Sequence, residues 1–161
     1  NQAGGQFPNP AVPVQREASR VPPVFPAEGP IVAVVNRANP IGDLSLRQLA
    51  GIYSGAVITW PNGEPVMAIN RPITSEVRKR FYWSVLHAKP TQKFFRISSP
   101  SGMPEPVPFE TVRIDSESAI AKFVSRDVRA IAYCYLSCAD ARVKILTIEG
   151  LAPREDGYAL K

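Results

Sequence analysis

The stretch NRPITSEVRKRF, from Asn70 to Phe81, connects a predicted strand to a predicted helix through a polar turn. The apolar run just before it, Val66 to Ile69, is typical of a short buried strand. Apolar residues recur at helical spacing after the turn, and Thr74 or Ser75 is the natural N-cap of that helix. The chain is therefore predicted to be arranged around a strand-turn-helix unit.

This turn has the chemistry of an anion site. A helix start carries unpaired N–H groups and a partial positive charge. Arg71, Thr74 and Ser75 add a cation and two hydroxyls. The basic triplet Arg78 to Arg80 follows in the first part of the helix, where its charge has the wrong sign for the helix dipole. Two interpretations of the triplet stay open: a solvated basic face, or a sign that negative charge binds nearby.

Strands and helices alternate along the rest of the chain. Further buried strands are predicted at Ile31–Asn36, Ala130–Cys134 and Val143–Ile148. Helices are predicted after N-caps at Ser45 and at Asp115-Ser116, a shorter helix at Gln92–Ile97, and a loop at Ser98–Pro108. Helices alternating with buried strands indicate an α/β fold with a mostly parallel sheet flanked by helices.

Residues 1–28 differ from the remainder of the chain. They are rich in proline and show neither helical nor strand periodicity, which predicts an extended arm or linker of polyproline character. One α/β domain over residues 29–161 is expected to follow. Val21, Val24 and Phe25 are apolar side chains that could contact a protein partner, so a passive spacer and a docking arm both remain open.

Composition narrows the classes of partner. The net charge of +5 and the sequence pI of about 9.5 favour anionic partners. The charges are scattered and no nucleic-acid motif accompanies them, so we expect no nucleic-acid binding. No apolar run approaches the ~20 residues of a membrane span. The chain begins at Asn1 rather than Met, which fits either an exported product whose signal peptide is removed or an engineered start. The first interpretation suggests a periplasmic or extracellular location.

The reactive residues are few. Cys134 and Cys138 lie four apart, so they could form a disulfide in an oxidising compartment or remain two buried free thiols. His87 is the sole histidine, so we expect neither a metal site nor a cofactor. A nucleophile elbow and a phosphate loop are both lacking. We therefore expect no catalytic residues and no enzyme.

Several landmarks follow one another in a recognisable order: Ile31–Asn36, Leu44–Gly55, Ile58–Trp60, then Arg71, Ser75 and Phe81, and finally Ala130–Tyr133. This order, over roughly residues 29–150, resembles the phosphate ABC-transporter substrate-binding proteins. The resemblance implies a periplasmic-binding-protein-like lobe of type 2, in a short, one-lobe version. The long first portion of the family, which builds most of the other lobe, has no counterpart here.

The resemblance also implies roles for individual residues. Arg71 would pair with an oxyanion, and Ser75 would donate its hydroxyl and backbone amide, with Thr74 and Glu76 beside them as further ligand-binding positions. The family's Ser-Gly-Thr reads Ser75-Glu76-Val77 here. Two functions are therefore expected as alternatives. The first is a periplasmic solute-binding domain for a small, phosphate-like oxyanion. The second is a non-transport interaction or scaffold subunit of a cell-envelope complex that kept the fold and lost ligand binding.

Overall fold

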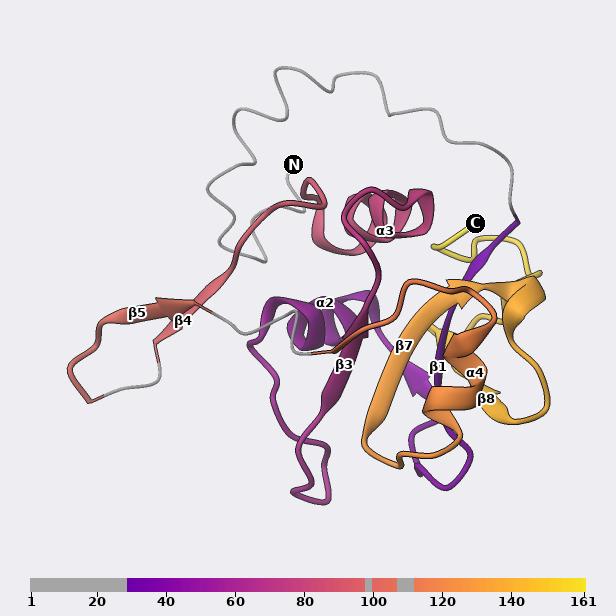
Figure 1. Ribbon diagram of the computed structural model, residues 1–161, viewed down its shortest axis with the longest axis horizontal. Helices are drawn as coiled ribbons and strands as arrows, with labels where there is room; N and C mark the ends of the chain where they lie inside the picture. Colours follow the sequence, from indigo (N-terminus) through magenta and orange to yellow (C-terminus); the bar gives the residue numbers. More distant parts are fainter. Residues whose placement is uncertain (1–28, 98–99, 107–111) are drawn as a thin grey trace.

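The computed structural model describes residues 29–97, 100–106 and 112–161; the predicted arm, residues 1–28, lies outside this part. At its centre is a five-stranded sheet in the order β6-β3-β7-β1-β8 (Figure 1). The strands are β1 (Ile31–Asn36), β3 (Met67–Asn70), β6 (Val112–Arg113), β7 (Ala130–Tyr135) and β8 (Val143–Ile145). β3 is parallel to β6 and β7, whereas β1 is antiparallel to β7 and β8. Four of the five strands share one direction, which confirms the mostly parallel sheet.

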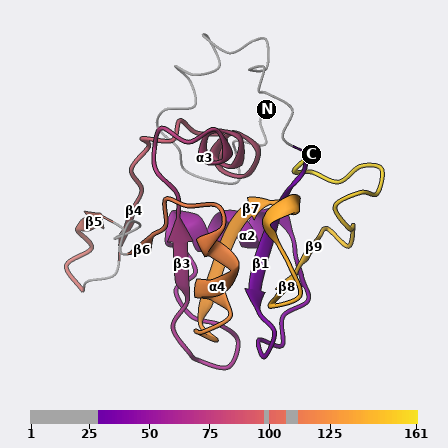
Figure 2. The ribbon, with the colours of Figure 1, turned by 45° about the vertical axis from the view of Figure 1, so that its right-hand side comes forward.

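Helices cover both faces of this sheet (Figures 1 and 2). On one face lie α2 (Leu46–Ser54), α3 (Glu76–Phe81) and the π-helical segment Tyr82–Leu86 that continues α3. The opposite face packs against α4 (Ala119–Val124). β1 and β7 lie between the two layers and are buried along nearly their whole length. A strand covered on both sides has no need of polar alternation, which explains the continuous apolar runs in the sequence.

The ends of α2 and the start of α3 follow local sequence signals. Ser45 caps α2 through a reciprocal capping box with Gln48, and Gly55 ends the helix in the left-handed conformation at φ 85°. Ser75 is the N-cap of α3, as predicted. His87 ends the π-helical segment with φ 53°. The predicted N-caps Ser45 and Ser75 are confirmed, and each depends on residues within one turn of the chain.

Two smaller sheets complete the fold. β2 (Asp43–Leu44) pairs in parallel with β9 (Thr147–Ile148) beside the N-terminus of α2. β4 (Phe95–Ile97) pairs with β5 (Pro104–Pro106) in an antiparallel hairpin that extends away from the rest of the molecule (Figure 1). A short 3-10 turn, Leu136–Cys138, follows β7.

The hairpin corrects two predictions. The expected helix at Gln92–Ile97 is wrong, since its second half is β4. Phe94 is 8% exposed and Phe95 is 60% exposed, a strand-like alternation between neighbours that a helix prediction overlooks. The expected loop at Ser98–Pro108 contains β5, and only part of that loop lies within the described residues.

Two further predictions placed an element incorrectly. α4 does not begin after an Asp115-Ser116 cap; Ser118 precedes it and makes no capping hydrogen bond through its side chain. The carboxylate of Asp115 instead pairs with Arg113 at 3.3 Å. The predicted strand Val143–Ile148 is split between β8 and β9, because the chain leaves the central sheet at the fully buried Leu146.

Candidate functional site

The turn from β3 into α3 holds the residues predicted to bind an anion. Arg71 directly follows β3, and Ser75 opens α3. The Ser75 hydroxyl accepts a hydrogen bond from the Arg78 backbone N–H at 3.3 Å and donates to the Pro72 carbonyl at 2.8 Å. The Ser75 backbone N–H also donates to the Pro72 carbonyl, at 3.0 Å. Both donors that the resemblance assigned to a ligand therefore stabilise the turn itself.

The Arg71 side chain is 3% exposed and extends across to the loop before α4. Its Nε donates to the Ile114 carbonyl at 2.8 Å, and one terminal nitrogen donates to the Asp115 carbonyl at 3.2 Å. The other terminal nitrogen forms an ion pair with the carboxylate of Glu117. The second oxygen of that carboxylate accepts the Tyr135 backbone N–H at 2.8 Å. Arg71 therefore already binds an oxyanion, the carboxylate of Glu117 in the same chain.

Glu117 is the site residue that sequence reasoning missed. It lies 46 residues after Arg71, in a segment that the sequence suggested was merely the cap of a helix. Its role depends on the pairing of β3 with β6 and with β7, which brings the two loops together. Local sequence contains no signal for such a contact.

The other two predicted ligand-binding residues lie at the outside of the turn. Thr74 is exposed. The Glu76 carboxylate accepts a hydrogen bond from the Lys79 ammonium at 2.9 Å, and the two side chains are 42% and 41% exposed. Glu76 therefore forms a surface pair along the helix, where its charge also complements the helix dipole.

The basic triplet is not a solvated face, because Arg78 and Arg80 are buried. The Arg78 guanidinium donates to the Arg71 carbonyl at 2.8 Å and to the Pro90 carbonyl at 2.6 and 3.1 Å. Arg80 donates to the Gly29 carbonyl at 3.0 Å. These two guanidinium groups connect α3 to segments before and after it. Their length and planar donor geometry suit them to collect backbone carbonyls at the edge of a domain.

A buried polar network lies below the turn. The Asn70 side chain is fully buried, donates to the Tyr82 hydroxyl at 3.0 Å and accepts from the Tyr133 hydroxyl. The Tyr133 ring stacks on Phe81 with centroids 3.9 Å apart. Burial raises the pKa of Tyr133 and of Tyr53 well above the ordinary tyrosine value. The network holds the end of β3, and with it Arg71, against the helix layer.

The two cysteines lie close to the same carboxylate. Cys134 and Cys138 are free thiols in the structure. Burial raises the pKa of the Cys134 thiol to about 12, with a smaller contribution from the charge of Glu117. The pKa of Cys138 is also raised, by burial first and then by its hydrogen bond to Glu117. Neither thiol has the low pKa of a nucleophilic cysteine.

The described part of the chain shows neither a cluster of metal-binding side chains nor a membrane-spanning helix. Over residues 29–97, 100–106 and 112–161, no three histidine, cysteine or acidic side chains gather in a way that could hold a metal ion. Within the same ranges, no helix combines the length and the apolar character that a membrane crossing needs.

Comparison with solved structures identifies the fold. The chain is similar to an ABC-type phosphate transport receptor from Vibrio cholerae, with 22% identity over 77% of this chain and 48% of that one, and a TM-score of 0.62. A second match is a putative phosphate ABC transporter substrate-binding protein with bound phosphate from Clostridium perfringens, with 22% identity, coverage of 77% and 46%, and a TM-score of 0.62. A third is the periplasmic phosphate-binding protein PfluDING bound with phosphate, with 20% identity, coverage of 74% and 37%, and a TM-score of 0.53.

These matches confirm the periplasmic-binding-protein fold that the sequence resemblance implied. The chain spans about half the length of the first two proteins. No protein-family model matches it, and no curated protein matches it by sequence.

Proposed function

We propose that this domain binds a small oxyanion of the phosphate class, and that the anion occupies Arg71 in exchange for the Glu117 carboxylate. The observation that carries the proposal is the Arg71–Glu117 pair. The turn already holds a planar oxyanion on a guanidinium whose orientation is fixed by two backbone carbonyls. A phosphate oxygen offers the same charge and acceptor geometry as a carboxylate oxygen.

The solved structures support this choice of ligand. These proteins of the same fold are a phosphate transport receptor and two proteins with bound phosphate. By analogy we extend the proposal to an exported, periplasmic protein that delivers the anion to an ABC transporter. Thr74 and Ser75 would supply further hydroxyl donors once the Ser75 hydroxyl turns from the Pro72 carbonyl toward the ligand. Glu76, held by Lys79, would stay on the outside of the turn.

The internal carboxylate sets the expected affinity. Glu117 is tethered within reach of Arg71, so a free anion must compete with a ligand at high effective concentration. A site enclosed by one lobe also leaves the anion partly in water, where charge interactions are weaker. The wild-type protein should therefore bind phosphate weakly, and removal of the Glu117 charge should strengthen binding.

Isothermal titration calorimetry with inorganic phosphate and with sulfate tests the proposal. Glu117→Gln should bind phosphate about tenfold or more tightly than wild type, which corresponds to ~1.4 kcal/mol. Arg71→Ala should abolish the heat. Glu76→Gln is the matched control, since it removes a carboxylate that pairs on the surface, and it should change affinity little. Absence of heat from folded Glu117→Gln at millimolar phosphate would overturn the proposal.

A second candidate is the interaction or scaffold subunit that kept the fold and lost ligand binding. The observation that favours it is again Glu117, because a permanent internal counter-ion would fill the site. In that case neither wild type nor Glu117→Gln binds phosphate. Deletion of residues 1–28 would instead abolish co-purification with a protein of the cell envelope. Phosphate binding by Glu117→Gln would argue against this candidate.

A further inference from the structure

The β4–β5 hairpin extends away from the body of the molecule in both ribbon views (Figures 1 and 2). Phe94, just before β4, is 8% exposed and belongs to the core, whereas Phe95 in β4 is 60% exposed and Met103 beside β5 is 65% exposed. Each strand has three residues. A two-stranded hairpin on its own is at best marginally stable in water, and a third strand is a usual means of stabilising it.

Two prolines determine which way the backbone groups of this hairpin point. The paired residues are Phe95 with Pro106, Arg96 with Glu105, and Ile97 with Pro104. Pairs in an antiparallel ladder alternate between those that exchange two hydrogen bonds and those that exchange none. Proline has no N–H, so the two outer pairs cannot be the bonded ones. The middle pair therefore makes the bonds, and the backbone groups of the outer residues point out of the hairpin.

The two outer edges of the hairpin consequently differ. Along β4, Phe95 and Ile97 each direct an N–H and a carbonyl outward, and these groups form the outer edge of β4. Along β5, Pro104 and Pro106 direct only carbonyls outward, so this edge is closed to a further strand. A strand that joins a sheet needs donors and acceptors at alternate residues. Within the described part of the chain, β5 is the one strand that pairs with β4.

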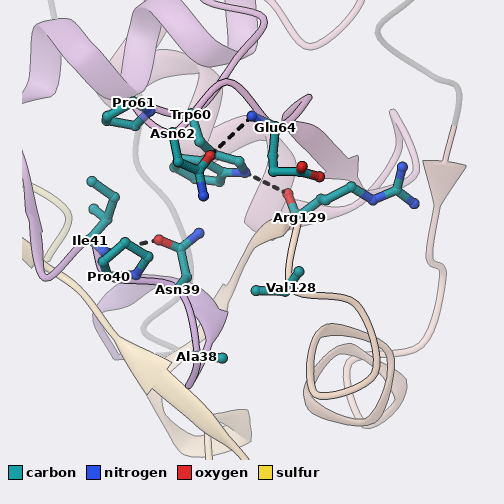
Figure 3. Close-up of a pocket in the computed structure, with 10 residues that line it drawn as sticks. All are labelled: Ala38, Asn39, Pro40, Ile41, Trp60, Pro61, Asn62, Glu64, Val128 and Arg129. Carbon is teal, nitrogen blue, oxygen red and sulfur yellow. Dashed lines mark hydrogen bonds between the residues drawn. The ribbon is translucent and has the colours of Figure 1, made fainter.

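The turn before β3 shows how another such turn is stabilised. Its backbone is paired internally, since the Val66 N–H donates to the Ile58 carbonyl at 2.9 Å. Its Trp60 side chain is 6% exposed and donates to the Arg129 carbonyl at 3.0 Å, the bond drawn from the indole in Figure 3. The aromatic side chain of this turn is thus buried against the body. Phe95 of the hairpin, at 60% exposed, remains available to a partner.

Charge indicates the kind of partner. The segment from residue 89 to residue 106 contains three basic residues, Lys89, Lys93 and Arg96, and one acidic residue, Glu105. Lys93 is exposed directly before β4. A second copy of β4 would bring the same positive charges together, and like charges on neighbouring strands are destabilising. A strand that carries acidic residues would instead be attracted to this edge.

We propose that the outer edge of β4 binds an extended acidic segment of a partner protein as the third strand of the β4–β5 sheet. The backbone N–H groups of Phe95 and Ile97 donate to carbonyls of the segment, and their carbonyls accept from its N–H groups. An apolar side chain of the segment packs against Phe95, and its acidic residues neutralise the positive charge of this region. The interaction does not involve Arg71 and does not depend on the proposed anion site.

NMR titration of the ¹⁵N-labelled full chain with an acetylated, amidated hexapeptide of alternating glutamate and valine tests this proposal. The backbone amide resonances of Phe95 and Ile97 should shift and saturate with the peptide, and their hydrogen exchange should slow. A peptide of alternating lysine and valine should bind more weakly because its charge has the wrong sign. The glutamate peptide with every amide nitrogen methylated lacks donors and should not bind.

A proline on β4 should close its edge as the prolines of β5 close theirs. Ile97→Pro removes one outward N–H and leaves the bonded pair of Arg96 with Glu105 in place. It should weaken binding of the glutamate peptide by about tenfold, as expected for one lost hydrogen bond. Met103→Ala is the matched control. It truncates an exposed apolar side chain of the hairpin outside the β4 edge and should leave peptide binding unchanged.

Four results would overturn the proposal. The first is a millimolar glutamate peptide that leaves the Phe95 and Ile97 amides unshifted. The second is a lysine peptide that binds as tightly as the glutamate peptide. The third is Ile97→Pro that binds the peptide like wild type. The fourth is a wild-type dimer in sedimentation that Ile97→Pro dissociates, because a second copy would then occupy the edge.

Discussion

The Arg71 guanidinium and the Glu117 carboxylate form an ion pair that joins the turn after β3 to the loop before α4. Arg71 is 3% exposed and Glu117 is 27% exposed, so the cation is much further from water than its partner. Because Glu117 also accepts the Tyr135 backbone N–H, one carboxylate connects three segments of the chain. Loss of that carboxylate would leave a buried charge without its counter-ion.

We expect Glu117→Ala to lower the free energy of unfolding by about 2–3 kcal/mol, measured by urea denaturation. The cost is mainly that of the unpaired Arg71. Arg71→Met combined with Glu117→Ala should therefore lose less stability than the sum of the two single variants. Glu76→Ala breaks a pair that is about two-fifths exposed and should change stability by no more than about 0.5 kcal/mol. Additive effects at Arg71 and Glu117 would contradict a coupled pair.

The buried tyrosines predict a loss of stability in alkaline solution. Burial raises the pKa of Tyr53 and Tyr133 in the folded protein, whereas unfolded tyrosine ionises near pH 10. Above that pH the unfolded chain releases protons that the folded chain keeps, so stability is full below about pH 10 and falls as the pH rises further. Each such tyrosine contributes a slope of up to ~1.4 kcal/mol per pH unit.

Urea denaturation from pH 8 to pH 11 measures this slope, and tyrosinate absorbance reports which state ionises. Tyr53→Phe should make the free energy of unfolding fall less steeply with pH, by the contribution of one tyrosine. It should also lower stability at neutral pH, because the hydroxyl donates to the carbonyls of Ile69 and Ile131. A slope that is unchanged in Tyr53→Phe would show that Tyr53 ionises normally in the folded protein.

Local signals in the sequence predicted much of the fold. The apolar run of β1 and the N-caps Ser45 and Ser75 each act through neighbouring residues, so they could be predicted directly from the sequence. The predictions that were wrong concern elements that depend on contacts between residues distant in the sequence. β4 exists through its pairing with β5, and its sequence alone gave a helix prediction.

The candidate site was predicted only in part, for the same reason. Arg71 and Ser75 lie on the predicted turn, but their partners decide what they can do. Glu117 reaches Arg71 from 46 residues away, and Arg78 turns inward to the carbonyl of Pro90. Long polar side chains can reach many acceptors, so spacing in the sequence does not determine whether they meet a ligand or the protein itself.

The thiols should be unreactive in the folded protein. With a pKa raised to about 12, Cys134 is almost entirely protonated at pH 8. We expect Cys138→Ser, which leaves Cys134 alone, to react with a disulfide reagent at least 100-fold more slowly when folded than when unfolded, since burial also blocks access. Thiol counting in denaturant should find two free thiols in wild type. Finding none would show a Cys134–Cys138 disulfide and contradict the free state.

Two serines test the capping of helices. Ser45 accepts the Gln48 backbone N–H at 3.0 Å, so Ser45→Ala should cost about 1 kcal/mol of unfolding free energy. Ser118 occupies the equivalent position before α4 without a side-chain capping bond. Ser118→Ala is therefore the matched control and should cost less than about 0.5 kcal/mol. Equal losses would mean that capping does not distinguish the two helices.

The buried Arg78 guanidinium donates hydrogen bonds to carbonyls of the protein itself. It is 2% exposed, and its guanidinium reaches the carbonyls of Arg71 and Pro90 from a position over the Tyr82 ring. Arg78→Lys keeps the charge but loses the planar set of donors, so it should lower the free energy of unfolding by about 2–4 kcal/mol in urea denaturation. The half-exposed Arg113 provides the control, and Arg113→Lys should be nearly neutral. Equal stability of the two lysine variants would mean that the charge of Arg78, rather than its geometry, holds α3 in place.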